Sequence, residues 1–480
     1  MVRSWKYLSK TDLRLFLDSP RHLWAKYHGV WHPSFSDFDK KTATDGYRVE
    51  KLAMDYLEHN YAVDGKILKK QQTFISESFL VRTDGLIYDP KTDTYDLYEV
   101  KSSTFDENEP KLDKTNLYDI AFQSLVLEKN IKVKNYYLLM LNANYRRKGN
   151  LDLDLLFRVV KINKEIKELK DDVLKFRQEM ISVVDAEECD AFEACYSPGT
   201  CGCKEICHPN LPEHNIYEMF ARSRTSIKKL RSEGILGITD VPSDFALNNR
   251  NERLIQVYKG KTNRLIESKK IKEILASYEY PIYFLDYETV SDPIPQFDGI
   301  RPYQNLATQY SLHVVQVDGT ITHHEYIYEG NDCPLRYTVE DMIRHVGTSG
   351  TILVWNEMFE KGVNRRAAES YPDLAEEIMF INARIKDLGD AFKKLFYIDK
   401  NFHCSWSIKK VLPVMCPECS YKELPINHGD QASFEWIKMN SEETSMNEKA
   451  RIRENLLRYC ELDTWAMVRI WQELKKEIVL

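Results

Sequence analysis

The sequence contains no long apolar run, and its first residues do not resemble a secretory leader. Across 480 residues, no apolar stretch approaches the roughly 20 residues that span a bilayer. The first residues, Met-Val-Arg-Ser-Trp-Lys-Tyr, lack the apolar centre of a secretory signal. We therefore expect a cytoplasmic protein that has no membrane partner. The composition agrees, since 43% hydrophobic and 29% charged residues are typical of a soluble globular chain.

The chain also lacks an excess of positive charge, internal repeats and low-complexity tracts. Its net charge of −7 argues against a protein coated in basic surface. A nuclease can nevertheless be acidic overall while one of its grooves is basic. A length of 480 residues exceeds one ordinary core and predicts two or three domains. We place the domains at residues 1–214, 215–277 and 278–480.

Cysteine is present, but we expect no disulfide framework, because disulfides are rare in the cytosol. Four of the ten cysteines follow the spacing Cys-x₅-Cys-x-Cys-x₃-Cys and provide enough thiolates for an iron–sulfur cubane or a tetrahedral zinc ion: Cys195, Cys201, Cys203 and Cys207. Cys189 is a spare. Cys416 and Cys419 resemble a zinc knuckle, but no second pair lies nearby, so we interpret them as structural or incidental. The twelve histidines suggest no independent metal site.

Acidic residues recur on a predicted strand and on a predicted helix of the third domain. The run 282–289 is typical of a central strand, in which Asp286 and Glu288 point to the same face. In a helix, residues i and i+4 share a face, so Tyr459 and Asp463 converge as well. Three carboxylates and a phenol in one place are what a two-cation phosphodiester-cleaving site requires.

These segments carry a family resemblance. In their order, Asp286-x-Glu288, residues 355–360 and Tyr459-x-x-x-Asp463 resemble the three motifs of the DEDD 3′–5′ exonucleases, in the subtype with tyrosine. More narrowly, the third domain is similar to DUF2779, a bacterial domain of unknown function; further matching segments are 284–289, 301–304, 309–313, 407–413 and 459–464.

The resemblance implies a ribonuclease H-like mixed sheet and a site for two Mg²⁺ or Mn²⁺ ions. The implied ligands are Asp286, Glu288, Glu360 and Asp463. Tyr459 would orient the attacking water. Glu360 stands where the family's second motif normally ends in aspartate, and Asp387 is a candidate to compensate.

The first domain shows a mixed α/β order of predicted elements. We expect helices at 9–17, 46–59 and 117–128, and strands at 73–80, 83–88, 95–101 and 135–141. Asp84, then Glu99 and Lys101 on one strand, then Gln123 on the next helix resemble the PD-(D/E)XK nuclease core. Residues 9–13 and 19–24 are similar to the start of Cas4 and RecB-type members.

This second resemblance implies another metal-dependent centre. Glu99 and Lys101 share a strand face, so a metal-binding carboxylate and an ammonium meet there, and Asp84 supplies a second carboxylate. Gln123 matches the family's accessory glutamine. Glu50 stands where many relatives carry a histidine, and either residue can bind Mn²⁺ or Mg²⁺.

The same resemblance bears on the cysteines. Cas4-like nucleases close this domain with a [4Fe–4S] cluster that takes one ligand from the first helix, where this chain has Ser19. The resemblance favours iron–sulfur on the four clustered cysteines, whereas the lost ligand favours zinc.

Residues 215–277 are rich in lysine and arginine, and 227–242 is typical of a small helix–turn–helix unit with glycines at its turn. Such a unit could bind phosphate through backbone N–H groups, or its lysines could simply face water.

We therefore expect an α/β, metal-dependent nuclease acting on nucleic acid, with DNA favoured over RNA and a single strand or an end as the substrate. The aromatic residues Tyr287, Phe359 and Trp406 could stack unpaired bases. The resemblance alone implies a role in repair, recombination or defence. The main rival is a nucleic-acid-binding protein with one or both sites inactive, and a weaker rival is a phosphatase acting on small phosphoesters.

Overall fold

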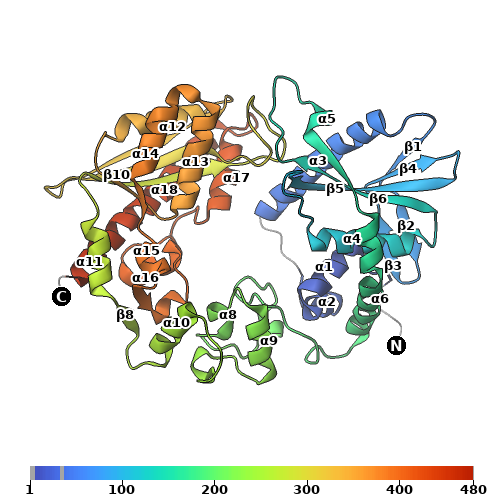
Figure 1. The fold of residues 1–480 in the computed structure, drawn as a ribbon, viewed down its shortest axis with the longest axis horizontal. Helices are drawn as coiled ribbons and strands as arrows, with labels where there is room; N and C mark the ends of the chain where they lie inside the picture. Colours follow the sequence, from blue (N-terminus) through green and yellow to red (C-terminus); the bar gives the residue numbers. More distant parts are fainter. Residues whose placement is uncertain (1–5, 33–36, 479–480) are drawn as a thin grey trace. The chain divides into compact units, whose positions relative to one another are not determined.

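The computed structural model describes residues 6–32 and 37–478. The protein is mixed α/β and divides into two compact units, each with its own five-stranded mixed sheet (Figure 1). Unit 1 comprises Met1–Asn210 and Asp292–Gln304, and unit 2 comprises Leu211–Ser291 and Asn305–Leu480. The basic segment 215–277 therefore groups with unit 2. Within the described ranges, no helix combines the length and apolarity needed to cross a membrane.

The elements of unit 1 are α1 (Lys10–Asp18), α2 (Pro20–Tyr27), α3 (Asp37–Asn60), β1 (Ile67–Lys70), β2 (Thr73–Ser76), β3 (Phe79–Arg82), β4 (Gly85–Asp89), β5 (Thr94–Phe105), α4 (Lys114–Leu127), β6 (Val133–Asn142), α5 (Leu153–Leu156), β7 (Phe157–Lys161), α6 (Asn163–Asp185) and α7 (Lys204–Cys207). Helix α1 begins with a capping box, in which Ser9 and Asp12 bond each other's backbone N–H groups, as its sequence predicts. The run 73–80 was predicted as one strand but forms the hairpin β2–β3, because Glu77 turns the chain in the left-handed conformation (φ 55°).

The unit 1 sheet has the strand order β1-β4-β5-β6-β7, in which only β5 and β6 run parallel. Successive residues of β5 enter different cores. Leu97 packs in the core that includes α4 and α6, whereas Tyr98 and Val100 pack in the core that includes α3. Glu99 and Lys101 therefore face the α4 side of the sheet.

Unit 1 includes a segment that lies between two strands of unit 2 in the sequence. Ile294 is buried in the same core as α3. The Arg48 guanidinium contacts Asp292 at 3.0 Å, and the Gly299 N–H donates to the Arg147 carbonyl at 2.8 Å. Residues 292–304 are thus built into the N-terminal unit although they follow β9.

The elements of unit 2 are α8 (Ile216–Met219), α9 (Arg224–Ser232), η1 (Ile238–Asp240), α10 (Asn249–Lys259), β8 (Arg264–Ile266), α11 (Ser268–Ala276), β9 (Ile282–Val290), β10 (Leu306–Val315), β11 (Ile321–Ile327), α12 (Pro334–His345), β12 (Thr351–Val354), α13 (Glu357–Ser370), η2 (Pro372–Leu374), α14 (Ala375–Arg384), β13 (Ile385–Asp387), α15 (Asp390–Lys393), β14 (Tyr397–Asp399), η3 (Lys400–Phe402), α16 (Ile408–Met415), α17 (Gly429–Met439) and α18 (Met446–Glu477). Asp318 and Gly319, a dipeptide typical of tight hairpin turns, join β10 to β11, with Gly319 at a φ of 88°.

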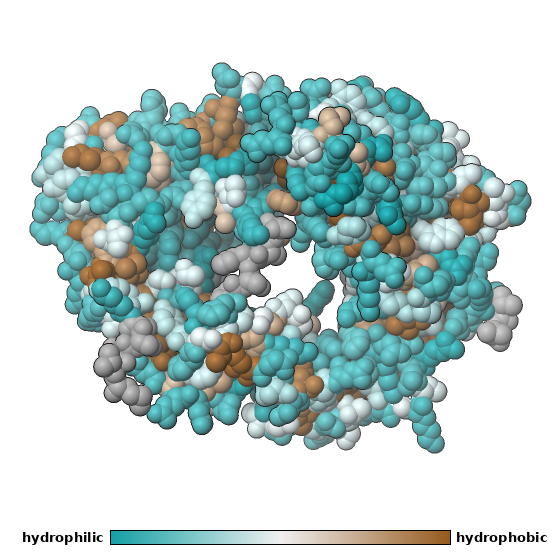
Figure 2. Space-filling model, turned by 180° about the vertical axis from the view of Figure 1, so that it is seen from behind, coloured by the Kyte–Doolittle hydropathy of each residue, from teal (hydrophilic) through white to brown (hydrophobic). Residues whose placement is uncertain are grey.

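The unit 2 sheet has the order β11-β10-β9-β12-β13. Its central strand β9 pairs antiparallel with β10 and parallel with β12. The long helix α18 and helix α17 pack against β9, and α12 packs against β10. On the face of the molecule shown in Figure 2, hydrophilic side chains dominate and the apolar ones occur in small separate groups.

Candidate functional site

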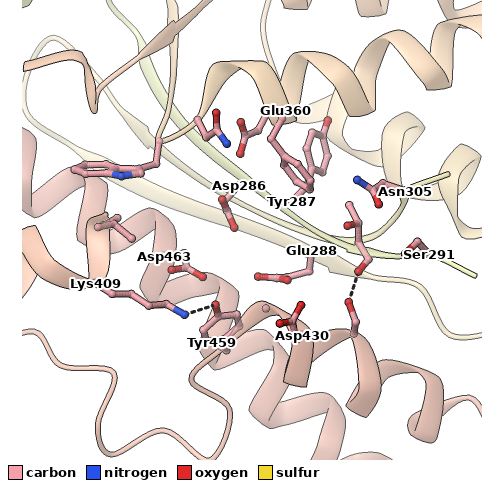
Figure 3. Close-up of a pocket in the computed structure, with 17 residues that line it drawn as sticks. Asp286, Tyr287, Glu288, Ser291, Asn305, Glu360, Lys409, Asp430, Tyr459 and Asp463 are labelled. Atoms are coloured by element: carbon pink, nitrogen blue, oxygen red, sulfur yellow. Dashed lines mark hydrogen bonds between the residues drawn. The ribbon is translucent and has the colours of Figure 1, made fainter. Parts of the chain in front are cut away.

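Acidic side chains from β9, α13 and α18 meet at a cavity of about 450 Å³ in unit 2 (Figure 3). Asp286 and Glu288 come from β9, where the alternation of side chains puts them on one face. Glu360 comes from α13 and Asp463 from α18. The structure therefore brings together all four acids that the sequence assigned to this centre. Tyr459, from α18, lines the same cavity.

Hydrogen bonds to strand β10 set the position of helix α18. Gln309 Nε2 donates to the Leu456 carbonyl at 2.8 Å, and Ser311 Oγ lies 2.6 Å from Thr464 Oγ1. Ser311 is paired across the sheet with Asp286, so it lies on the same face as that carboxylate. Because these contacts hold α18 at both sides of Tyr459, the phenol and Asp463 are directed towards β9.

Positive charge only partly compensates the carboxylates of this cavity. Burial, followed by the nearby carboxylates of which Asp463 is the strongest, raises the pKa of both Asp286 and Glu288 well above the usual range. Burial raises the pKa of Asp463 to about 6, and burial and Asp387 raise that of Glu360 to about 8. Such shifts mean that the acids repel one another and would be stabilised by a bound cation.

Glu360 is buried, and its Oε2 atom makes no hydrogen bond within the described residues. Asp387 lies behind it at the end of β13. One Asp387 oxygen is bound by the Lys393 ammonium and by the Glu357 N–H at 3.1 Å. Asp387 is not among the residues that line the cavity, so Glu360 is the second-motif acid that reaches it.

Two residues that sequence reasoning did not assign complete this centre. The Lys409 ammonium lies 3.4 Å from the Tyr459 hydroxyl and lowers the pKa of the three neighbouring acids against the effect of burial. The Tyr421 hydroxyl donates to Asp463 Oδ1 at 2.6 Å. Lys409 belongs to the segment 407–413 that carried the family resemblance, which was the signal available for it.

The three aromatic residues proposed for base stacking differ in their surroundings. Tyr287 also lines the cavity, but it is buried and its hydroxyl is engaged, since it donates to Asn364 at 3.0 Å. Phe359 lines the cavity and is partly exposed. Trp406 is not among the lining residues, and the Lys393 ammonium lies 4.2 Å from the centre of its ring. Phe359 is therefore the best placed of the three to meet a bound base.

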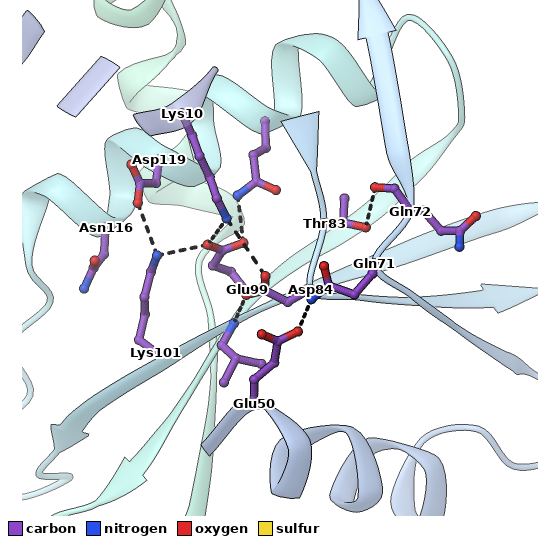
Figure 4. Close-up of polar contacts among 12 residues, drawn as sticks. Lys10, Glu50, Gln71, Gln72, Thr83, Asp84, Glu99, Lys101, Asn116 and Asp119 are labelled. Atoms are coloured by element: carbon purple, nitrogen blue, oxygen red, sulfur yellow. Dashed lines mark hydrogen bonds and ion pairs between the residues drawn. The ribbon is translucent and has the colours of Figure 1, made fainter. Parts of the chain in front are cut away.

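A second polar centre lies in unit 1 (Figure 4). Glu99 is buried on β5, where its two oxygens accept from the Lys101 ammonium at 2.9 Å and from Gln123 Nε2 at 2.7 Å. Asp84 precedes β4 and accepts from the Val100 N–H at 2.9 Å, next to Glu99. Glu50 is held by the Gln71 amide and raises the pKa of Asp84. The structure thus gathers the five predicted residues of this centre.

Cations compensate the unit 1 acids more fully than those of unit 2. Lys10, from α1, donates to Glu99 at 2.7 Å and lies 4.0 Å from Asp84. Although burial opposes the shift, Lys101 and Lys10 lower the pKa of Glu99 to about 2. Burial and the charge of Glu99 raise that of Asp84 to about 7. Lys10, to which sequence reasoning assigned no role, therefore lies between the two carboxylates.

At the cysteine-rich end of unit 1, the side chains that lie close enough together to share a metal ion differ from the four cysteines expected. One ligand atom from each of His22, Cys201, Cys203 and Cys207 lies within 4.8 Å of the other three. Cys195 lies beside them in the same small core, and its sulfur is 3.2 Å from His208 Nε2. Ser19 instead bonds the Glu193 carbonyl at 2.8 Å. Among the residues described, no metal-ligand group includes Cys189, Cys416 or Cys419.

Part of unit 2 matches a known protein family. Residues 283–407 match the family described as Domain of unknown function (DUF2779). The match includes the strand with Asp286 and Glu288 and the helix with Glu360, and it ends before Lys409 and α18. No curated protein matches the chain.

Proposed function

We propose that this protein is a divalent-metal-dependent nuclease whose principal centre is the carboxylate cavity of unit 2. The observation that carries the proposal is the convergence of the partly exposed Asp286 and Glu288 on the buried Asp463. Burial and the charge of Asp463 raise the pKa of Asp286 and Glu288, and burial raises that of Asp463. Burying like charges together is unfavourable unless a cation binds them. Oxygen ligands of this kind suit Mg²⁺ or Mn²⁺.

The donor set fits two such ions, which Asp286, Glu288, Glu360 and Asp463 would hold. Bound there, they would supply Lewis acidity and neutralise the charge of a phosphodiester. Burial raises the pKa of Tyr459 far above its usual value, so the phenol stays neutral and can orient a water molecule by hydrogen bonding. The Lys409 ammonium beside it would stabilise negative charge that develops on the phosphate.

The fold of each unit supports the same activity. A five-stranded sheet in which β9 is central, with an antiparallel pair on one side and parallel strands on the other, is typical of the ribonuclease H-like class. Asp84, Glu99 and Lys101 around one strand end are typical of a PD-(D/E)XK centre. We infer that the two units are a DEDD-type and a Cas4/RecB-like domain.

The proposed substrate is a polynucleotide, with DNA favoured, that enters as a single strand or at an end. The cavity volume of about 450 Å³ is within the range that holds one small organic molecule. A terminal nucleotide therefore fits better than an intact duplex. Phe359 is placed to stack on its base.

For unit 1 we retain a second candidate function, which is nucleic-acid binding without cleavage. The specific observation in its favour is Lys10, whose ammonium bridges Asp84 and Glu99. A divalent ion at this position would have to displace that ammonium. Lys10, Lys101 and Arg14 could then serve to bind phosphate groups instead.

The proposal is tested with Asp286→Asn and Asp84→Asn variants, assayed on end-labelled single and double strands with Mg²⁺ and with Mn²⁺. We expect Asp286→Asn to lower cleavage by about 100-fold or more, because a metal ligand is lost. It should also raise the melting temperature, because it removes one of several repelling charges. The matched control is Asp318→Asn in the exposed β10–β11 turn. If neither site variant lowers cleavage, neither carboxylate centre cleaves the strand, and nucleic-acid binding without cleavage is the function that remains.

A further inference from the structure

The metal-ligating side chains at the end of unit 1 come from two distant parts of the sequence. Cys201, Cys203 and Cys207 lie at and before α7, whereas His22 lies on α2, about 180 residues earlier. His22, Cys203 and Cys207 are buried and Cys201 is partly exposed. Four groups that can bind a transition metal thus meet in a largely closed space.

The histidine is oriented in the way that metal-bound histidines are. His22 Nε2 lies 3.3 Å from the Cys201 sulfur, and His22 Nδ1 lies 2.6 Å from an Asp18 carboxylate oxygen. A ligating imidazole almost always donates its other N–H to a carboxylate, carbonyl or water, which fixes the ring and makes the ligating nitrogen more basic. Asp18, the last residue of α1, lies just across the extended residue Ser19 from α2 and supplies that partner.

The spacing of the ligand atoms distinguishes between the two metal centres that the cysteines could form. Around one tetrahedral zinc ion with ligands about 2.3 Å away, sulfur atoms lie about 3.8 Å apart. A [4Fe–4S] cluster instead binds each thiolate through a different iron, so its ligands surround a whole cube and stand further apart. Ligand atoms that all lie within 4.8 Å of one another fit the single ion and not the cube.

We propose that His22, Cys201, Cys203 and Cys207 bind one structural Zn²⁺ ion. The histidine from the first helix pair takes the role that a fourth cysteine would have. The Cys195 thiol contacts Cys207, Cys201 and His208, but it is not among the ligand atoms that all lie within 4.8 Å of one another, so it stays outside the ligand set. Four protein ligands leave no open position, so the ion has a structural and not a catalytic role.

The surroundings support a tightly packed site. A side chain at Gly202, between two of the ligands, would begin only 3.0 Å from the Trp31 indole, so the indole would have to move to admit it. The Trp31 ring also packs against the His22 ring. The Arg21 guanidinium donates to the carbonyls of Asp190, Phe192 and Ile206 at 2.8 to 2.9 Å, which ties α2 to the cysteine segment beside the ligands.

The zinc ion would also affect the unit 1 carboxylates through the helices. Helix α1 packs against α2 and carries Lys10 and Arg14, which contact Glu99 and Asp119. An ion that fixes α2 therefore helps to hold both cations at the acids. Zinc binding itself does not depend on cleavage by either carboxylate centre.

The test is the metal content of the full chain, purified without oxygen from cells supplied with both iron and zinc. We expect about one zinc per chain, no iron, and no broad visible absorbance. Substitution with Co²⁺ should give the intense visible bands of a tetrahedral thiolate site. Iron and sulfide in place of zinc, with a brown colour, would overturn the proposal, and so would a chain that binds neither metal.

Variants then identify the ligands through zinc affinity, measured by competition with a chromogenic chelator. His22→Ala should lower zinc affinity by about 100-fold or more, Asp18→Asn by about 10- to 100-fold, and His22→Cys should retain zinc. Cys195→Ser should also retain it, and the matched control is His28→Ala at the end of the same helix. Unchanged zinc affinity in His22→Ala, or its loss in Cys195→Ser, would show that the ligands are the four cysteines.

Discussion

The Lys10 ammonium lies 2.7 Å from Glu99 Oε1, although the two residues are 89 positions apart. Lys10 is the first residue of α1, and Ser9 caps that helix. The start of α1 thus places the Lys10 ammonium at the buried Glu99 carboxylate. The sequence pattern predicts that the same carboxylate binds a divalent ion. Lys10 and the ion would compete for the same oxygen atoms.

Replacing Lys10 should therefore strengthen cation binding in unit 1. We expect Lys10→Ala to raise Mn²⁺ affinity there by about tenfold or more, because a unit charge about 4 Å away contributes a few kcal/mol at a partly screened site. Calorimetric titration would measure this in a background with Asp286→Asn and Asp463→Asn. Lys10→Arg keeps the charge and should leave the affinity low. A lower affinity in Lys10→Ala would show that the lysine supports the metal site.

The stability of the cation-free protein should fall as pH rises. The pKa of Asp463 is raised to about 6 and that of Glu360 to about 8, so the folded protein keeps protons that the unfolded chain has lost above about pH 4. The stability that these protons give is present below pH 4 and is lost progressively up to about pH 8. Thermal melts between pH 5 and 8 after dialysis against cation-free buffer would measure the trend.

Added Mn²⁺ should then stabilise the protein more at pH 8 than at pH 6, because the ion competes with protons for the same carboxylates. Asp286→Asn should flatten both trends. A melting temperature that does not change with pH in the wild-type chain would contradict the charge repulsion described for this cavity.

Two substitutions at Glu360 should distinguish the effect of its charge on cleavage from the effect of its side-chain length. Glu360→Asp keeps the carboxylate and shortens its reach by one methylene, so we expect cleavage to stay within about tenfold of wild type. Glu360→Gln removes the charge and should lower cleavage by about 100-fold. Rates measured across a Mn²⁺ titration would distinguish weaker ion binding from slower chemistry. Equal activity in both variants would show that Glu360 is not a ligand.

Removing the Tyr459 hydroxyl should slow the chemical step and leave substrate binding nearly unchanged. Tyr459→Phe keeps the buried ring but loses the group that would orient water beside Lys409. We expect kcat to fall by about 100-fold, which is typical of a lost positioning or proton-transfer group, with KM within about twofold. Tyr337→Phe, at an exposed phenol, is the matched control. A loss expressed only in KM would indicate a role in substrate binding.

The local geometry of the two carboxylate centres could be predicted from the sequence. Asp286 and Glu288 share a strand face because side chains alternate, and Tyr459 and Asp463 share a helix face because their spacing is close to one turn. Both rules involve only neighbouring residues. The turn at Asp318 and Gly319 is local in the same sense, because the Asp-Gly dipeptide itself favours a hairpin there.

Contacts between distant segments could not be predicted in this way. Lys10, His22 and Lys409 reach their sites from helices that are far away in the sequence, and a single lysine or histidine carries no periodic signal. In the first helices, sequence reasoning considered only position 19, where a cysteine is replaced by Ser19. The proposed metal ligand is His22, three residues further along the chain. Sequence spacing identified the cysteines but did not reveal which of them lie close enough together to share an ion.

The segment 292–304 has a consequence for how the protein is made. Ile294 completes the α3 core, and Asp292 and Gly299 provide partners for Arg48 and Arg147. A ribosome that has released the first 214 residues has not yet supplied these parts, so the N-terminal unit can finish folding only after β9 has also been synthesised. If the gene were split after residue 214, the α3 core would be encoded apart from Ile294, which is buried in it.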